Sequence, residues 1–96
     1  MITMHEAYHE CMGPLASALK ARRDELGVTQ IVAARIVDVS QASYSRWERQ
    51  TAPDAAYFDA IAKFLGYKDA DDGTFCTLMV RNYIWLAKVR DGGFEA

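Results

Sequence analysis

The segment 41–49, QASYSRWER, combines an amide, hydroxyls and two guanidinium groups at helical spacing. Tyr44 and Trp47 are three residues apart, which predicts that they pack inward on one helix face and favours core packing over stacking on bases. The side chains left outside are Gln41, Ala42, Ser43, Ser45, Arg46 and Arg49. Such groups supply the donors and acceptors that contact base edges and phosphates in a major groove. The segment therefore predicts a DNA-binding helix.

A second group of reactive side chains is His5-Glu6-Ala7-Tyr8-His9, which has the H-E-x-x-H spacing of zinc proteases. Those enzymes also use a third ligand and a substrate-binding scaffold. His5 and His9 are the two histidines of the chain, and Glu10 follows too closely on the same helix to be an ordinary third ligand. We expect a solvated helix with no protease activity, no functional metal and no cofactor. Adventitious metal binding by the histidine pair is the alternative.

Two short helices and a tight turn would position the DNA-binding segment. Apolar residues at 31, 33, 34 and 37 predict a helix over 30–37, capped by Thr29. Asp38 tolerates the left-handed conformation that a sharp turn needs. Ser40 is placed to cap the helix at 41–49. The sequence thus predicts a helix-turn-helix.

The remaining sequence predicts further helices and no strand. A helix at about 4–12 would have a Thr3–Glu6 capping box and would stop at Gly13. The other expected helices are 14–26 with Leu15, Leu19 and Leu26 inward and Gly27 as terminator, about 55–65 capped by Asp54, and about 74–90 between Asp71 or Asp72 and Gly92-Gly93. The expected fold is an all-α, compact bundle of five to six helices with a central helix-turn-helix.

Several sequence features occur in a fixed order. Gln30 and Gln41 open the two helices, and the small Ala34 stands where the helices would cross. "SRWER" and then "APDAAYFDAIAKFLGY" follow. This set, over about residues 15–67, resembles the helix-turn-helix of the phage Cro and repressor (XRE) family, and implies a lambda-repressor-like bundle. Asp38 and Gln50 stand where that family commonly has Gly.

Roles for individual side chains follow from this chemistry and from the resemblance. Base contacts are expected from Gln41, Ala42, Ser45 and Arg46, and phosphate contacts from Gln30, Ser43 and Arg49. The resemblance implies that Glu48 pairs internally with Arg23, a solvent-exposed Glu48 being the alternative. Arg35 is either a surface charge or a phosphate contact, and Arg22 and Lys20 are interpreted as solvated charges.

The overall charge argues mildly against nucleic acid, because the net charge is −2 and the pI about 5.6. Residues 15–52, however, hold six basic against four acidic side chains, whereas residues 53–96 hold five against seven. The acidity therefore lies outside the motif, and weak binding per chain favours a dimer. Cys11 and Cys76 lack metal-ligand spacing. With no evident signal peptide or membrane span, we expect a cytoplasmic protein without membrane contact.

The last predicted helix is apolar over more than one face, so part of it needs a further partner. We predict a homodimer through this helix, with Trp85 as the anchor and with Met79, Tyr83 and Leu86 as further interface residues. The alternative is that the N-terminal helix covers the second face. The corresponding division is an N-terminal extension (1–13), a helix-turn-helix domain (14–67) and a dimerisation element (68–96).

The sequence thus predicts a non-enzymatic, sequence-specific DNA-binding transcriptional regulator that binds double-stranded DNA as a homodimer. A phage or prophage repressor or Cro-like protein on a palindromic operator is the preferred interpretation. The alternative is a module of antitoxin-like or anti-repressor type, which would use the same fold to bind a protein partner. The acidic ends and the apolar last helix favour that alternative.

Overall fold

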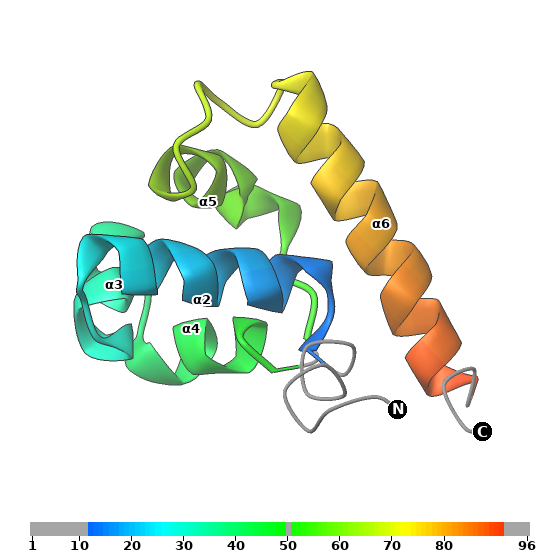
Figure 1. The fold of residues 1–96 in the computed structure, drawn as a ribbon, viewed down its shortest axis with the longest axis horizontal. Helices are drawn as coiled ribbons and strands as arrows, with labels where there is room; N and C mark the ends of the chain where they lie inside the picture. The colour runs from blue at the N-terminus through cyan, green and yellow to red at the C-terminus, as the bar shows by residue number, and fades with distance from the viewer. Residues whose placement is uncertain (1–11, 50, 92–96) are drawn as a thin grey trace.

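The computed structural model describes residues 12–49 and 51–91, and every regular element in that part of the chain is a helix. The predicted all-α bundle is therefore confirmed. The elements are α2 (Pro14–Leu26), α3 (Gln30–Ile36), α4 (Gln41–Trp47), the 3₁₀ turn η1 (Ala55–Tyr57), α5 (Phe58–Phe64) and α6 (Gly73–Arg90). In Figure 1, α4 and α5 lie on opposite sides of α2, and α6 runs obliquely past the N-terminal end of α2.

Helix α2 begins and ends where its local sequence predicts. Pro14 lacks a backbone N–H, and its fixed φ suits the first turn of a helix. Gly27 follows the last turn with φ 68°, and its N–H donates to the carbonyls of Arg23 and Asp24. The predicted bounds, 14–26, are confirmed.

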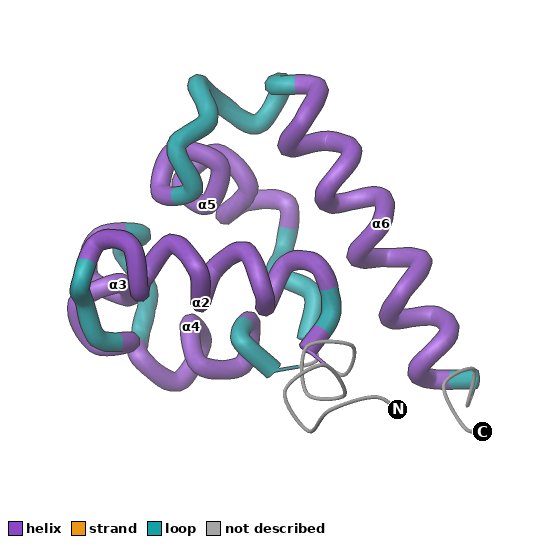
Figure 2. Tube along the Cα trace, viewed as in Figure 1, coloured by secondary structure: helices purple, strands orange, loops and turns teal. Residues whose placement is uncertain are grey.

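The predicted helix-turn-helix is formed by α3, a tight turn and α4, which pack against each other (Figure 2). Thr29 and Ser40 each accept a hydrogen bond from the backbone N–H three residues later, at 3.3 and 3.1 Å. Asp38 has φ 60°, so its left-handed conformation is also confirmed. The helices α3 and α4 are one and two residues shorter than predicted.

The helix predicted over 55–65 is divided in two. Asp54 precedes η1, and its side chain makes no capping hydrogen bond, so the cap predicted there is wrong. The physical reason is a tighter first turn, in which the N–H of Tyr57 donates to the carbonyl of Asp54 at 3.0 Å. The α-helical part, α5, begins only at Phe58.

A single cluster of buried side chains joins α2 to α6. Its members are Leu15, Leu19, Ala33, Ala34, Val37, Tyr44, Trp47, Ile61, Ala62, Phe64, Phe75 and Met79. Two apolar residues that the sequence directed inward are outside it, because Leu26 is 43% and Ile31 46% exposed. Helix α3 packs through its face of small side chains, which leaves Ile31 in solvent, and Leu26 is the last residue of α2.

Helix α6 is joined to α2 by packing and by one buried polar contact. Asn82 is 4% exposed, and its Oδ1 accepts a hydrogen bond from the backbone N–H of Leu15 at 3.1 Å. Gly13 precedes α2 and has no side chain to cap it, so Asn82 supplies the missing acceptor from α6. Asn82 was not predicted from the sequence, although an asparagine among inward-facing apolar residues indicates a buried polar contact.

The structure changes the role of Trp85. The sequence placed this side chain on the free face of the last helix, which is wrong: Trp85 is 9% exposed and Met79 4%. A Cβ added to Gly13 would lie 2.7 Å from Cε3 of Trp85, so the indole packs directly on that backbone. Tyr83 remains 49% exposed, and Leu86 is half-buried.

Some predictions fall on residues outside the described ranges. These are the helix at 4–12 with its Thr3–Glu6 capping box, the His5 and His9 pair, Cys11, and the stop at Gly92-Gly93. They stay predictions, as does the division into segments 1–13, 14–67 and 68–96. Within the described residues, α6 shares its core with the helix-turn-helix, because Phe75 and Met79 belong to the same buried cluster.

Candidate nucleic-acid interface

Helix α4 presents one polar, cationic surface to solvent. Ala42, Arg46 and Arg49 follow one another at i, i+4 and i+7, and all three are exposed. Gln41, in the first turn, is exposed as well. We call these four residues the α4 outer face. It contains two guanidinium groups and an amide but no carboxylate.

Two serines flank the outer face and are only half-buried. The Ser43 hydroxyl accepts hydrogen bonds from Nη2 of Arg46 at 3.4 Å and from Oγ of Ser40 at 3.1 Å. Arg46 is therefore partly oriented before any ligand arrives, which lowers the entropy lost on binding. Ser45 lies beside Arg46 in the sequence but is less accessible.

The opposite side of α4 belongs to the core, as predicted. Tyr44 is fully buried and Trp47 is 5% exposed. Their rings lie 6.1 Å apart, and the Tyr44 ring meets Phe64 edge-on at 6.2 Å. Neither ring is free to stack on a base, so their contribution is to hold the outer face in place.

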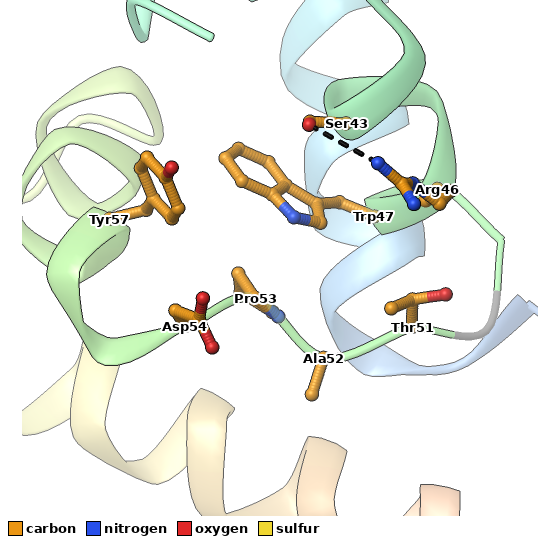
Figure 3. A pocket seen from close by; sticks show the side chains of 8 residues that line it. All are labelled: Ser43, Arg46, Trp47, Thr51, Ala52, Pro53, Asp54 and Tyr57. Carbon is orange, nitrogen blue, oxygen red and sulfur yellow. Dashed lines mark hydrogen bonds between the residues drawn. The ribbon is translucent and has the colours of Figure 1, made fainter. Parts of the chain in front are cut away.

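A shallow groove of about 240 Å³ adjoins Arg46 at the end of α4 (Figure 3). It is lined by Ser43, Arg46, Trp47, Thr51, Ala52, Pro53, Asp54 and Tyr57. The exposed Tyr57 ring lies 5.5 Å from the buried Trp47 ring, measured between centroids. This lining offers hydroxyls, a guanidinium and the carboxylate of Asp54 for hydrogen bonding. Tyr57, the last residue of η1, was not predicted from the sequence to belong to the site.

The two side chains predicted to form an internal ion pair are in contact. Arg23 donates to Glu48 through Nε at 2.5 Å and through Nη2 at 2.8 Å. The exposed fractions of these side chains are 15% for Arg23 and 5% for Glu48. Paired hydrogen bonds between a guanidinium and a carboxylate fix both distance and orientation. The end of α4 is thereby attached to α2.

The protonation equilibria around this pair reflect burial and hydrogen bonding together. Burial alone would raise the pKa of Glu48, but hydrogen bonding, chiefly from Arg23, outweighs it, and the pKa is lowered. Burial raises the pKa of the neighbouring Tyr44. The Tyr44 hydroxyl also lowers the pKa of Glu48. Among the described residues, however, no group meets the geometric criteria for a hydrogen bond with this buried hydroxyl. Glu48 is therefore an anion neutralised from inside the protein.

Gln30 has a contact that the sequence did not predict. Its Nε2 donates to Oε1 of Glu48 at 3.2 Å, so the amide predicted to contact phosphate is engaged with the ion pair. Arg22 also differs from the expected solvated charge. Its Nε donates to the carbonyl of Phe64 at 2.8 Å, at the end of α5. Arg35, by contrast, is exposed on α3.

A helix-turn-helix family profile matches residues 19–72, more than half of the chain. The chain belongs to the XRE-type helix-turn-helix family. It is therefore a DNA-binding transcription regulator of the XRE type, and this family is not a family of enzymes. Comparisons with curated proteins and with solved structures gave no match.

The potential metal-binding side chains of this XRE-type protein are dispersed over the described residues. No group of three or more His, Cys, Asp or Glu side chains comes together there in a way that could hold a metal ion. Nor does any helix in residues 12–49 and 51–91 have the length and apolar character needed to cross a membrane.

Proposed function

We propose that this XRE-type protein is a sequence-specific regulator, a phage or prophage repressor or Cro-like protein, that acts in the cytoplasm and binds a palindromic operator as a homodimer. The observation that carries the proposal is the α4 outer face. Arg46 and Arg49 are exposed there, while Glu48, which lies between them in the sequence, is turned inward and neutralised by Arg23. A phosphate backbone approaching this face would meet two cations and an amide, and the exposed carboxylate of Asp54 lies outside the face, in the adjoining groove.

The proposed contacts divide by chemistry. Gln41 and Arg46 can each make a bidentate contact with a purine edge, while Ala42 and Ser45 would contact bases by close packing and by a hydroxyl. Arg49 and Ser43 would contact phosphates. Gln30 is retained as a phosphate contact through its backbone N–H, because its side-chain amide is engaged with Glu48.

Dimerisation would compensate for the weak electrostatic attraction between a single acidic chain and DNA. The chain carries a net charge of −2, and each outer face has only two arginines, so one copy would gain little from releasing counterions. Two copies on the two half-sites of a palindrome, about 34 Å apart, would bind with a high effective local concentration. Affinity would then depend on the dimer as much as on any one contact.

A second candidate function, binding of a protein partner by an antitoxin-like or anti-repressor module, has one specific observation in its favour. The outward side of α3 has three large exposed aliphatic side chains, Ile31 at 46%, Val32 at 38% and Ile36 at 54% exposed. Such a group on a seven-residue helix is more typical of a protein-binding surface than of one that only contacts DNA.

A salt titration separates the two candidates. Binding to a fluorescent random-sequence duplex is measured by anisotropy from 50 to about 200 mM salt, beside a duplex selected by the protein from a random pool. DNA binding predicts a steep negative salt slope on both duplexes and much tighter binding to the selected one. Arg49→Ala should reduce the slope by about one unit on both. Lys63→Ala is the matched control, because Lys63 is an exposed cation on α5, paired with Asp59. No binding to either duplex at low salt would reject the proposal in favour of a protein partner.

A further inference from the structure

Helix α6 has a second apolar stripe that does not face its own core. Val80, Tyr83 and Ile84 are 57, 49 and 52% exposed, and Cys76 is exposed as well. Val80, Ile84 and the half-buried Ala87 lie away from the buried residues Phe75, Met79, Asn82 and Trp85, whereas Tyr83, four residues after Met79, lies at the border of the buried side. We call Cys76, Val80, Tyr83, Ile84 and Ala87 the second face of α6.

The spacing within the second face is that of helix-on-helix packing. Cys76, Val80, Tyr83 and Ala87 are separated by four, three and four residues, the alternation that places knobs on one seam of a coiled coil. A helix that meets only solvent has no need of this alternation. The second face therefore fits another helix of similar length.

The positions are symmetric along the helix. A two-fold axis midway between residues 81 and 82, perpendicular to α6, exchanges Cys76 with Ala87 and Val80 with Tyr83. In an antiparallel pair, small side chains at the ends would therefore meet small ones, and large side chains near the middle would meet large ones. The same surface on both copies is what a closed two-fold dimer requires.

Charge selects the antiparallel orientation over the parallel one. The segment just before α6 is acidic overall, with Asp69, Asp71 and Asp72 against Lys68, and the last turn of α6 is basic, with Lys88 and Arg90. Oδ1 of Asp91 lies 3.9 Å from Nε of Arg90. This acid reduces the difference in charge between the two ends of α6 but does not reverse it. A parallel pair would bring like ends together, whereas an antiparallel pair brings acid to base and opposes the two helix dipoles.

We propose that the second face of α6 binds the same face of a second copy in antiparallel orientation, with Val80 against the partner's Tyr83 and Cys76 against the partner's Ala87. The inference rests on the proposed dimeric regulator and specifies its interface. It replaces Trp85 as the anchor, because that indole is already packed on Gly13.

Cross-linking tests the orientation with the chain's own cysteine. Two variants are made, and both carry Cys11→Ser. The first keeps Cys76 as its thiol. The second also carries Cys76→Ser and Ala87→Cys, so that its thiol lies at position 87. Each is oxidised mildly alone and in an equal mixture, and disulfides form only where the Cα atoms come within about 7 Å. The antiparallel pair predicts a species of about twice the 10.8 kDa chain in the mixture alone. Cross-linking of each chain by itself would show a parallel pair, and none in any sample would remove the interface; both results overturn the proposal.

Sedimentation gives a second readout that does not depend on a disulfide. Tyr83→Glu changes an exposed side chain, so the chain should stay folded by circular dichroism and sediment as a monomer. Thr77→Glu, at an exposed position of α6 outside the second face, should leave the dimer intact. A dimeric Tyr83→Glu variant would contradict the interface.

DNA binding is measured with the same variants under reducing conditions. It distinguishes failure of the proposed interface from failure of the proposed DNA-binding function. Tight operator binding without the predicted cross-link would overturn the interface and leave the DNA-binding function standing. A correct cross-link in a chain that binds no DNA would support the interface and count against the proposed function.

Discussion

Arg23 and Glu48 join α2 to the end of α4 by two parallel hydrogen bonds, at 2.5 and 2.8 Å. Both side chains are largely buried, and Gln30 donates a third hydrogen bond to the same carboxylate. The contact therefore involves all three helices that position the α4 outer face. Its loss would loosen that face as well as lower stability.

A double-mutant cycle measures this coupling. Arg23→Ala and Glu48→Ala should each lower the free energy of unfolding by about 3 kcal/mol, because each leaves a charge with little access to water. The double variant should lose clearly less than the sum of the two losses, by at least about 1 kcal/mol in urea denaturation. Additive losses would mean that the two side chains do not stabilise one another.

Stability should also depend on the protonation of Glu48. Its pKa is lowered in the folded protein, whereas the unfolded chain has the ordinary value of about 4.3. The stability that it contributes is therefore present above about pH 4.3 and is lost as the pH falls through the lower, folded pKa. Glu48→Gln should reduce stability at pH 7 and flatten its fall between about pH 5 and pH 2.

Urea midpoints across this pH range test the Glu48 prediction. Glu25→Gln is the control, because Glu25 forms a surface pair with Arg22 and its side chain is 68% exposed. That variant should follow the wild-type curve closely. A Glu48→Gln curve parallel to the wild type would contradict the linkage.

The turn of the helix-turn-helix should tolerate glycine. Asp38 has φ 60°, which is strained for most residues with a Cβ and free of strain for glycine. Asp38→Gly should leave stability unchanged or raise it by up to about 1 kcal/mol, while Asp38→Val should lower it by about 1–2 kcal/mol. Thermal or urea unfolding of the pair tests this, and a stable valine variant would be inconsistent with a left-handed turn.

Substitution of Gly13 should lower the free energy of unfolding far more than substitution of Gly27. Both have positive φ, but a Cβ on Gly13 would lie 2.7 Å from the Trp85 ring, and one on Gly27 would meet nothing within 4 Å. We expect Gly13→Ala to lower stability by about 2–4 kcal/mol, from strain and overpacking together. Gly27→Ala should lower it by about 1 kcal/mol. In a Trp85→Ala background the Gly13→Ala loss should shrink, and an unchanged loss would leave backbone strain as its sole cause.

The helix-turn-helix was predictable because its determinants are local. Thr29 and Ser40 each cap a helix through the backbone three residues later, and Asp38 turns the chain by its own φ. The spacing of Tyr44 and Trp47 identifies the inward side of α4, and hence its outer face. None of these inferences needs knowledge of how distant segments pack.

The incorrect predictions concern features that depend on how distant segments of the chain pack together. The last helix has two apolar faces, and its sequence alone does not say which one its own core covers. Gly13 makes room for Trp85, and Asn82 caps Leu15, so the face with these residues is the covered one. Gln30 likewise was assigned to DNA, because only the packing of α3 on α4 brings its amide to Glu48.

The most direct test of the central claim, that the α4 outer face recognises DNA sequence, is binding-site selection with wild type and Arg46→Ala on the same random duplex pool. Wild type should enrich a palindromic site. Arg46→Ala should bind that site about 1–3 kcal/mol more weakly and lose its preference at one base position in each half-site. Lys63→Ala, which removes the same charge from α5, should enrich the wild-type site. An unchanged site from Arg46→Ala, or no enrichment by wild type, would contradict recognition through this face.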